Sequence, residues 1–360
     1  MKKIVCFIDS LSSGGAQRQL VGLAGLLKDK GYQVKVITYH DIPFYKPLLD
    51  LKKIEFEYVR RANNKWLRIY YISKAIKQYR TDLVIAYLDP CAIITCIIKI
   101  FGGKYKLIVS ERNTTQRLNC KERLKFFLYR KADYIVPNSY SQKNFITNHF
   151  PKLKEKTITI TNFVDTETFS PLKTLSCKNK PLQIIGVGRV LEQKNILRFL
   201  SALRLVIDNG IELHVKWYGE QFDYFQLCKS KVKELSLQQY IEFKGLNNSI
   251  WEEYRKADVF CLPSIYEGYP NVICEAMSCG LPILCSNVSD NPQIVKDQEN
   301  GFLFNPLDVN DIAFKIEKFA KIPIEKRDEM GTKSRNLAIS NFSKEAFISK
   351  YIQIIKSLEK

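Results

Sequence analysis

Two carboxylates with a defined spacing are the strongest sign of chemistry in this sequence. Glu267 and Glu275 are separated by seven residues, and a Gly-Tyr-Pro turn follows the first of them. An apolar helix pattern starts near Asn271, which places Glu267 in the loop before the helix and Glu275 one turn inside it. A helix N-terminus offers free amides and a partial positive charge, which suit a diphosphate or sugar hydroxyls. The segment expected to make such contacts comprises Gly268, Tyr269, Pro270, Asn271 and Val272.

Two cations beside a glycine turn form a second candidate. Arg189 and Lys194 follow a Gly-Val-Gly turn that ends at Gly188. A guanidinium can fork onto two phosphate oxygens and an ammonium acts as a point charge, so the arrangement suits a diphosphate. A nicotinamide site would need a small residue where Leu191 stands, which argues against a dehydrogenase. Taken alone, the two cations are more typical of solvated surface charges.

A third candidate is the glycine pair Gly14 and Gly15, which follows the first apolar run and opens onto a helix pattern. Such a loop brings backbone amides and a positive helix terminus to a phosphate. A plain turn between a strand and a helix is the alternative interpretation, because the order of a dinucleotide fingerprint is missing. Gly15 is a candidate for contacts to a donor, and Gly14 and Arg18 are candidates for contacts to a sugar or an acceptor.

The elements that must position these residues alternate between short apolar runs and amphipathic segments. This alternation predicts parallel sheets with crossover helices, an α/β fold of two doubly wound, Rossmann-like domains. Strands are expected at residues 4–8, 34–38, 83–86, 107–109 and 134–136, and then at 182–189, 213–218, 241–243, 259–262 and 283–285.

A Lys-rich, polar stretch at 174–181 is typical of a linker between the two domains. The expected domains are residues 1–170 and residues 171–342, followed by a C-terminal segment at 343–360. Apolar residues recur at helical spacing along that segment. The helix either caps the second domain or crosses back to the first.

Composition excludes several classes of site. The 360 residues include ten cysteines and three histidines, but neighbouring cysteines miss the CxxC spacing of zinc sites. Most of the cysteines stand in apolar runs, where thiols pack as small hydrophobic groups, and this fits a reducing cytoplasm. The longest apolar stretch, at 91–98, falls well short of the roughly 20 residues of a membrane span. The first apolar run is also too short for a signal peptide.

The positive charge is concentrated in the first half. Residues 1–170 hold 30 Lys and Arg against 14 Asp and Glu, whereas residues 171–360 hold 26 against 23. Two segments, 60–80 and 117–131, combine many cations with aromatic residues, which suits an anionic membrane surface. Solvated helix faces with aromatics packed inward are the alternative. Nucleic acid is disfavoured, because the sequence has neither a helix-turn-helix signature nor an aromatic RNA-binding sheet motif.

The motifs together resemble family-four glycosyltransferases of the GT-B fold, of the bacterial surface-polysaccharide type. The resemblance rests on the glycine pair, the segment NFVDTETFSP at 162–171, the GVGR and Lys194 pair, the two glutamates, and NGFLF at 300–304, in this order. It covers the chain from about residue 4 to residue 304. Many relatives have a histidine after a strand of the first domain, whereas this chain has the run SERN. Its members Glu111, Arg112 and Asn113 are candidates for sugar or acceptor contacts, with a structural salt bridge as the alternative for the charged pair.

The resemblance implies roles for the candidate residues. Arg189 and Lys194 would hold the donor diphosphate and stabilise the charge that develops on the leaving group, so that no divalent metal and no other cofactor is needed. Glu267, together with the loop after it, would hold the donor sugar, and Glu275 would bind the ribose hydroxyls. The turn at Lys244 would lie near the base.

The implied function is that of a retaining, metal-independent hexosyltransferase. It would move a hexose or N-acetylhexosamine from a nucleotide sugar, expected to be UDP-linked, to a lipid-linked saccharide in the synthesis of lipopolysaccharide, capsule or a similar polysaccharide. The first domain would bind the acceptor and the second the donor. The protein would be cytoplasmic and peripheral on the inner face of the plasma membrane. Alternatives are a non-catalytic nucleotide-sugar-binding protein, a sugar-nucleotide epimerase and a phosphorylase of similar architecture.

Overall fold

The computed structural model describes residues 3–65, 67–113, 115, 117–172 and 181–359. The predicted linker at 174–181 lies outside these residues except for Pro181. The chain divides into two units, one formed by Met1–Phe163 with Glu345–Lys360 and the other by Val164–Lys344. The structure thus divides the chain after residues 163 and 344, whereas the sequence pattern predicted the domain boundaries after residues 170 and 342.

The first unit is built on a parallel sheet of six strands in the order β3-β2-β1-β4-β5-β6. Every strand predicted in this half is present. The strand β3 was not predicted, because its residues Glu-Phe-Glu-Tyr alternate in polarity at a half-exposed edge instead of forming an apolar run. The strands are β1 (Lys3–Phe7), β2 (Gln33–Thr38), β3 (Glu55–Tyr58), β4 (Leu83–Tyr87), β5 (Lys106–Glu111) and β6 (Tyr134–Pro137).

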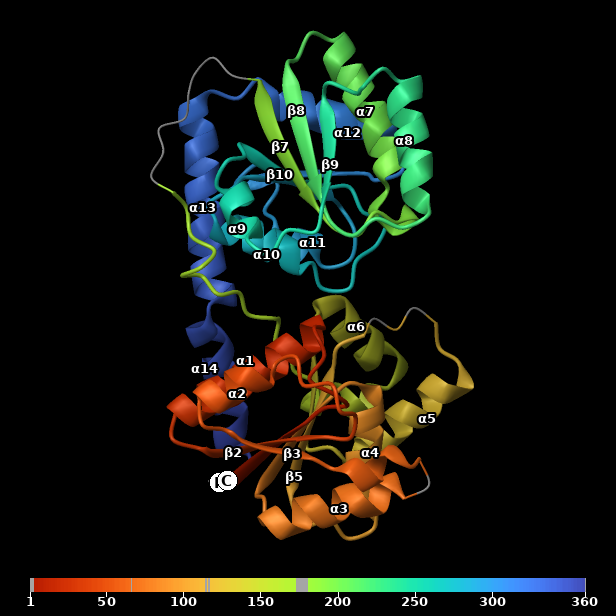
Figure 1. The fold of residues 1–360 in the computed structure, drawn as a ribbon, viewed down its shortest axis with the longest axis vertical. Coiled ribbons are helices and arrows are strands. Elements are labelled where there is room, and N and C mark those ends of the chain that lie inside the picture. Colours follow the sequence, from red (N-terminus) through yellow and green to blue (C-terminus); the bar gives the residue numbers. More distant parts are fainter. Residues whose placement is uncertain (1–2, 66, 114, 116, 173–180, 360) are drawn as a thin grey trace. The chain divides into compact units, whose positions relative to one another are not determined.

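Helices cover both faces of this sheet and bury one apolar cluster on each side (Figure 1). One face is covered by α1 (Gly15–Asp29), α2 (Lys46–Leu51) and α14 (Lys344–Ser357). The other is covered by α3 (Arg68–Tyr79), α4 (Asp89–Ile100), α5 (Cys120–Leu128) and α6 (Tyr140–His149). The predicted C-terminal helix is therefore present, and its apolar stripe packs in the first unit.

The second unit repeats this plan with the strand order β12-β11-β10-β7-β8-β9, again all parallel. Each strand predicted in this half is present, and β12 is an additional edge strand. The strands are β7 (Leu182–Val187), β8 (Leu213–Tyr218), β9 (Ile241–Gly245), β10 (Val259–Leu262), β11 (Ile283–Ser286) and β12 (Gly301–Phe304).

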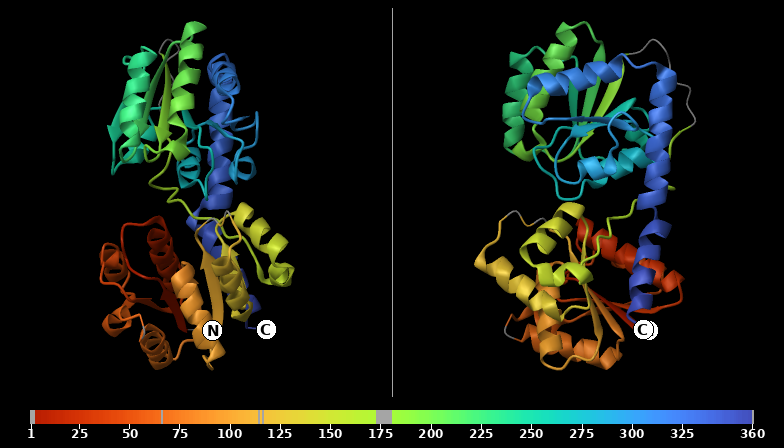
Figure 2. Two further views of the ribbon diagram at one scale, coloured as in Figure 1. Left: turned by 90° about the vertical axis from the view of Figure 1, so that its right-hand side faces the viewer. Right: turned by 180° about the vertical axis from the view of Figure 1, so that it is seen from behind.

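Helices again cover both faces of this sheet (Figures 1 and 2), and one apolar cluster lies on each face. One is covered by α7 (Ile196–Asp208), α8 (Tyr224–Glu234) and α12 (Val309–Ala320). The other is covered by α9 (Ile250–Tyr254) and α10 (Asn271–Ser278), with the short helix α11 (Asn291–Ile294) after β11. The long helix α13 (Ile324–Phe342) contributes to both clusters.

The strand orders locate where a ligand is expected in each unit. In the second sheet the chain runs outward from β7 to β9, then returns to place β10 on the other side of β7. In the first sheet β1 and β4 stand in the same relation. Ligands of open parallel sheets bind at the carboxyl ends of the strands beside such a reversal. A ligand is therefore expected beside the loops after β7 and β10 in the second unit and beside those after β1 and β4 in the first.

The described part of the chain contains no disulfide, and its cysteines pack as apolar side chains. All nine cysteines in the described part are free thiols, and all of these except Cys120 are buried. Burial raises the pKa of Cys6 and of Cys274 to about 12, which keeps them protonated and inert. Within the described residues, no helix combines the length and apolar character needed to cross a bilayer.

Candidate functional site

The reversal in the second unit brings a predicted cation and a predicted carboxylate into contact. Lys194 lies in the loop after β7 and Glu267 in the loop after β10, 73 residues later. The Lys194 Nζ donates to Glu267 Oε1 at 2.5 Å, and the two side chains are only 13% and 9% exposed. Because an ammonium has three N–H donors, this bond leaves Lys194 able to donate to a second anion.

Glycine makes room for the lysine stem. A Cβ on Gly188 would lie 2.8 Å from Cε of Lys194, closer than two carbons approach. Gly219, after β8, has a φ of +149°, and a Cβ there would lie 2.1 Å from the carbonyl oxygen of Gly188. The Trp217 indole also donates to this carbonyl at 2.9 Å. The turn at Gly188 is therefore fixed from both sides, and it lets the lysine chain run directly past the backbone.

Asn195 ties the loop after β7 to the neighbouring strand ends. Its backbone is left-handed with a φ of +58°, and its side chain is 3% exposed. The side-chain amide donates to the carbonyls of Pro263 at 3.0 Å and Pro306 at 2.7 Å. Two residues earlier, the backbone carbonyl of Gln193 accepts a hydrogen bond from the N–H of Ile265, in the loop of Glu267, at 2.9 Å. These bonds fix the position of the Lys194 loop relative to the Glu267 loop.

The helix α10 starts at Asn271, as the sequence pattern predicts. Glu275 lies inside it and is 7% exposed, between the fully buried Cys274 and Ala276. The segment 268–272 forms the loop and the first helical residues, with Gly268, Asn271 and Val272 half-buried. Tyr269 is buried and its hydroxyl lies 3.4 Å from Cys274 Sγ. The Tyr269 side chain therefore packs inward, which leaves only its backbone for the predicted contact to a donor.

The remaining predicted residues of the second unit are on the surface. Arg189 is exposed at the start of the loop that carries Lys194. Lys244, near the end of β9, is also exposed and forms an ion pair with Glu242. The Lys244 side chain is thus engaged on its own strand, which fits main-chain contacts from this turn better than a side-chain contact.

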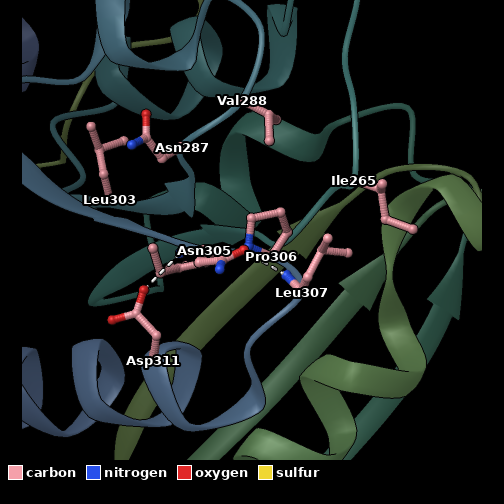
Figure 3. Close-up of a pocket in the computed structure, with 9 residues that line it drawn as sticks. Ile265, Asn287, Val288, Leu303, Asn305, Pro306, Leu307 and Asp311 are labelled. Atoms are coloured by element: carbon pink, nitrogen blue, oxygen red, sulfur yellow. Dashed lines mark hydrogen bonds between the residues drawn. The ribbon is translucent and has the colours of Figure 1, made fainter.

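A hollow of about 500 Å³ lies at the carboxyl ends of β10, β11 and β12 (Figure 3). Asp311, from α12, points toward Asn305 and accepts a bond from its N–H at 2.7 Å. Asn305 Oδ1 in turn accepts from Leu307 N–H at 3.0 Å. Asn305, Leu307 and Asp311 are therefore bonded to one another, and of the Glu267 loop only Ile265 lines the hollow.

The glycine loop of the first unit follows β1, at the reversal between β1 and β4. Gly14 caps α1, and Gly15 is its first residue. A Cβ on Gly14 would lie 2.2 Å from Oε1 of Gln17, and the Nε2 of the same side chain donates to Asp9 Oδ1 at 3.2 Å. Gly15 and Arg18 are exposed. The helix N-terminus is thus accessible, as a phosphate contact requires, while Gln17 and Asp9 hold the loop from beneath.

Glu111 differs from the expectation of a sugar contact, because the structure buries it completely. Its carboxylate accepts bonds from Tyr129 at 2.5 Å, Lys125 at 3.1 Å and Gln142 at 3.3 Å. Lys125, 2% exposed, also contacts Asp89 at 3.2 Å. The alternative of a structural ion pair therefore describes the position of Glu111. The sequence did not reveal it, because the partner lysine comes from the exposed-looking basic segment that follows.

Arg112 points to the opposite side of β5 and holds the C-terminal helix. Its guanidinium lies 4.0 Å from the Tyr87 ring centroid and donates to Asn162 at 2.6 Å and to the Tyr351 hydroxyl at 3.2 Å. The Tyr351 and Tyr87 hydroxyls are 3.0 Å apart. These contacts give Arg112 a structural role in the first unit. Asn113, next to it, is exposed and remains a candidate for acceptor contacts.

The buried Glu111 predicts a dependence of stability on pH. Burial raises its pKa to about 7 from an ordinary value of 4.5, with Lys125 opposing this shift and Asp89 adding to it. Between these pH values the folded protein keeps a proton that the unfolded chain has released, so the free energy of unfolding should fall as pH rises through this range and level off above it. Urea denaturation at a series of pH values, beside Glu111→Gln, measures this. Parallel profiles for the two proteins would contradict the assignment.

Among the described residues, no group of three or more His, Cys, Asp or Glu side chains is arranged to hold a metal ion. The predicted charged residues beside the reversal of the second unit are the cations Arg189 and Lys194 and the carboxylates Glu267 and Glu275, and the exposed Glu192 stands in the same loop as Lys194. This set offers direct contacts to an anion and to hydroxyl groups.

Comparisons with known proteins cover nearly the whole chain. The family model described as Glycosyltransferase Family 4 matches residues 13–168, and that described as Glycosyl transferases group 1 matches residues 173–337. Among solved structures, a glycosyltransferase from Rickettsia africae superposes with a TM-score of 0.88 at 18% identity, covering 100% of this chain and 99% of that one. This likeness concerns the fold, and it includes both six-stranded sheets.

Two curated relatives have described activities. The chain is 27% identical, over 84% of its length and 86% of the relative's, to N-acetylgalactosamine-N,N'-diacetylbacillosaminyl-diphospho-undecaprenol 4-alpha-N-acetylgalactosaminyltransferase of Campylobacter jejuni. It is 31% identical to UDP-Gal:alpha-D-GlcNAc-diphosphoundecaprenol alpha-1,3-galactosyltransferase of Escherichia coli, over 55% of this chain and 52% of that enzyme.

Proposed function

Because the chain belongs to the group 1 and family 4 glycosyltransferases and has their GT-B fold, we propose that it transfers a hexose or an N-acetylhexosamine from a UDP-linked donor to a lipid-linked saccharide. It is a glycosyltransferase of the hexosyltransferase class that serves the synthesis of a surface polysaccharide.

The observation that carries the proposed donor site is the contact between Lys194 and Glu267 at the reversal of the second sheet. A doubly wound sheet binds its ligand at this position, and the pair offers an ammonium for phosphate beside a carboxylate for sugar hydroxyls. Arg189, exposed in the same loop, adds a guanidinium for the diphosphate. Glu275 inside α10 supplies a second carboxylate, which we assign to the ribose hydroxyls.

Departure of the nucleotide places negative charge on the β-phosphate oxygen. Cations held in place before the reaction stabilise that charge without the cost of reorganising solvent. Lys194 is held in this way, since Glu267 and the turn at Gly188 determine the course of its side chain. Arg189 and Lys194 therefore supply the positive charge for which other transferases use a divalent metal, and the proposed reaction needs none.

We infer that the donor configuration is retained. The acceptor oxygen attacks the anomeric carbon from the same face of the sugar ring from which the nucleotide departs. The bond between the anomeric carbon and the phosphate oxygen breaks, the acceptor oxygen forms the new bond, and its proton passes to the departing phosphate. Glu267 is bound to Lys194, so it serves better as an orienting group than as the nucleophile of a double displacement.

The proposed lipid-linked acceptor is supported by the two relatives, whose described substrates are carried on diphospho-undecaprenol and one of whose donors is UDP-galactose. It also fits the excess of positive charge in residues 1–170, because a diphosphate acceptor and an anionic membrane both carry negative charge. We therefore propose that the first unit binds the acceptor, the second unit binds the donor, and the enzyme works at the cytoplasmic face of the plasma membrane.

Calorimetry with a panel of UDP-, GDP- and ADP-sugars tests the donor class. One UDP-sugar is expected to bind more tightly than its GDP and ADP counterparts, and EDTA should leave its affinity unchanged because the protein supplies the cations. Binding that disappears in EDTA would contradict the proposed metal-independent site. Selective binding of a GDP- or ADP-sugar would replace the UDP assignment.

A further inference from the structure

The helix α5 exposes two apolar side chains on an otherwise basic surface. Leu124 and Phe127 are each 60% exposed, and their spacing of three residues places them on one side of the helix. Figure 1 shows α5 at the periphery of the first unit. The cost of leaving two large apolar side chains in water makes this face a candidate for contact with another apolar phase.

The inner side of the helix is packed through Lys125 and Phe126, so this exposure does not come from a frayed end. Asn119 caps the helix by accepting from Glu122 N–H at 2.9 Å. Phe126 is fully buried, with its ring centroid 4.8 Å from that of Phe150. Tyr129, which follows the helix, is also fully buried. The inner residues therefore orient Leu124 and Phe127 outward on a rigid support.

The charges of α5 are sorted between its two sides. The exposed cations of α5 itself are Lys121 and Arg123. Arg117, Arg130 and Lys131 are exposed in the chain on either side of it, and Arg130 lies 5.6 Å from the Phe127 ring centroid. The one acidic residue of segment 117–131, Glu122, is 15% exposed and pairs with the buried Lys125 at 2.7 Å. The outer side thus presents two apolar side chains among cations, with the carboxylate directed away.

We propose that this face of α5 docks on a bilayer that contains anionic phospholipid, with Leu124 and Phe127 inserted between the headgroups. Apolar side chains flanked by Lys and Arg fit the boundary between acyl chains and negatively charged headgroups. The proposal deepens the proposed action on a lipid-linked acceptor and rests on it. It assigns the docking to one helix face and two inserting residues.

The other basic segment, 60–80, is a weaker match to such a surface. Arg68 donates to the carbonyls of Ala62 and Asn63 and lies 4.1 Å from the Tyr39 ring centroid. Arg61 lies 5.8 Å from the Tyr71 ring centroid. These two cations are thus engaged within the unit. The segment also exposes Leu67, Ile69 and Tyr70 at 46%, 36% and 63%, and of these only Tyr70 is as exposed as Leu124 and Phe127. Tyr70 therefore provides an internal comparison for the test.

Sedimentation of the full chain with phosphatidylcholine vesicles, with and without phosphatidylglycerol, tests the proposal. The wild type should bind only the anionic vesicles, and added salt should weaken binding. Leu124→Ser and Phe127→Ser should each lower the partition coefficient on the order of tenfold, because each removes an inserted apolar side chain. Phe314→Ser, at a 58% exposed phenylalanine of the second unit, is the matched control and should bind as the wild type does. Tyr70→Ser should behave like this control.

Three results would overturn the assignment. Unchanged vesicle binding by Leu124→Ser and Phe127→Ser would show that these residues do not insert, and a loss in Tyr70→Ser alone would assign docking to segment 60–80. Tighter binding of duplex or single-stranded DNA than of anionic vesicles, lost in the same two variants, would identify a nucleic-acid surface. Since vesicle binding is measured without donor, its outcome is independent of the nucleotide-sugar titration. Melting temperatures equal to that of the wild type show that the variants are folded.

Discussion

Replacing Lys194 with alanine should reduce kcat for sugar transfer on the order of 10²–10³-fold, the usual effect of removing one preorganised group that stabilises charge in a transition state. Lys194 is 13% exposed, and its ammonium is placed by Glu267 and by the turn at Gly188, so solvent cannot substitute for it. Steady-state transfer rates with saturating nucleotide sugar measure the effect. Lys194→Arg keeps the charge, but the planar guanidinium does not fit the space that the lysine chain occupies beside Gly188. This variant should therefore recover only part of the rate.

Stability must be separated from catalysis in this experiment, because alanine leaves the Glu267 carboxylate without its ammonium partner. An uncompensated, mostly buried charge destabilises the fold. Combining Lys194→Ala with Glu267→Gln should therefore raise the melting temperature above that of the single variant while transfer stays low. If the double variant recovered the transfer rate, the loss in Lys194→Ala would be one of stability and the proposed catalytic role would be wrong.

Replacing Glu275 with alanine should lower kcat/KM with the nucleotide sugar on the order of 10²–10⁴-fold. The proposed role is to accept hydrogen bonds from two ribose hydroxyls, and a hydrogen bond to a charged group contributes about 1.5–3 kcal/mol. The loss should appear mainly as a higher KM, since both the ground state and the transition state contain the ribose. Calorimetric titration of the free nucleotide diphosphate should show a matching loss of affinity.

A 2′,3′-dideoxy nucleotide supplies the control for Glu275. The wild type should bind it weakly, and Glu275→Ala should bind it no more weakly than the wild type does, because the interaction is absent in both cases. A further loss of affinity for the dideoxy nucleotide in the variant would show that Glu275 acts elsewhere in the site. Glu275→Gln keeps an acceptor oxygen without the charge, so its affinity for the ordinary nucleotide should lie between those of the wild type and Glu275→Ala.

The fold was largely predictable because parallel strands buried on both faces have continuous apolar runs. The run at 83–86 lies in β4, where every residue is buried, and the run at 259–262 is β10 itself. The edge strand β3 lacks this signature, since its Glu55 and Glu57 face Lys35 on β2. Edge strands are half-exposed, so their composition resembles that of a loop.

The positions of the candidate-site residues in the fold were predictable where a local pattern describes them. Asn271 begins α10 as expected, and the loop with Lys194 follows β7. The contact between Lys194 and Glu267 depends on the order of the strands, which local patterns do not contain. The burial of Glu111 likewise depends on Lys125 turning inward from a helix whose neighbouring cations are exposed. Charge composition alone therefore assigned all cations of that segment to one surface.

The chain passes between the two units twice, after Phe163 and after Lys344, and the two passages are bonded to each other. Val164 N–H donates to Phe342 O at 2.8 Å, and Lys344 forms an ion pair with Asp165 at 2.7 Å. In the gene, the whole second unit is consequently one uninterrupted stretch whose ends meet in space. Recombination between relatives can exchange that stretch as a cassette, while α14 and the first unit stay on the parental chain. Under the proposal that the second unit binds the donor, such an exchange would change the donor while the core of the first unit stays as it was.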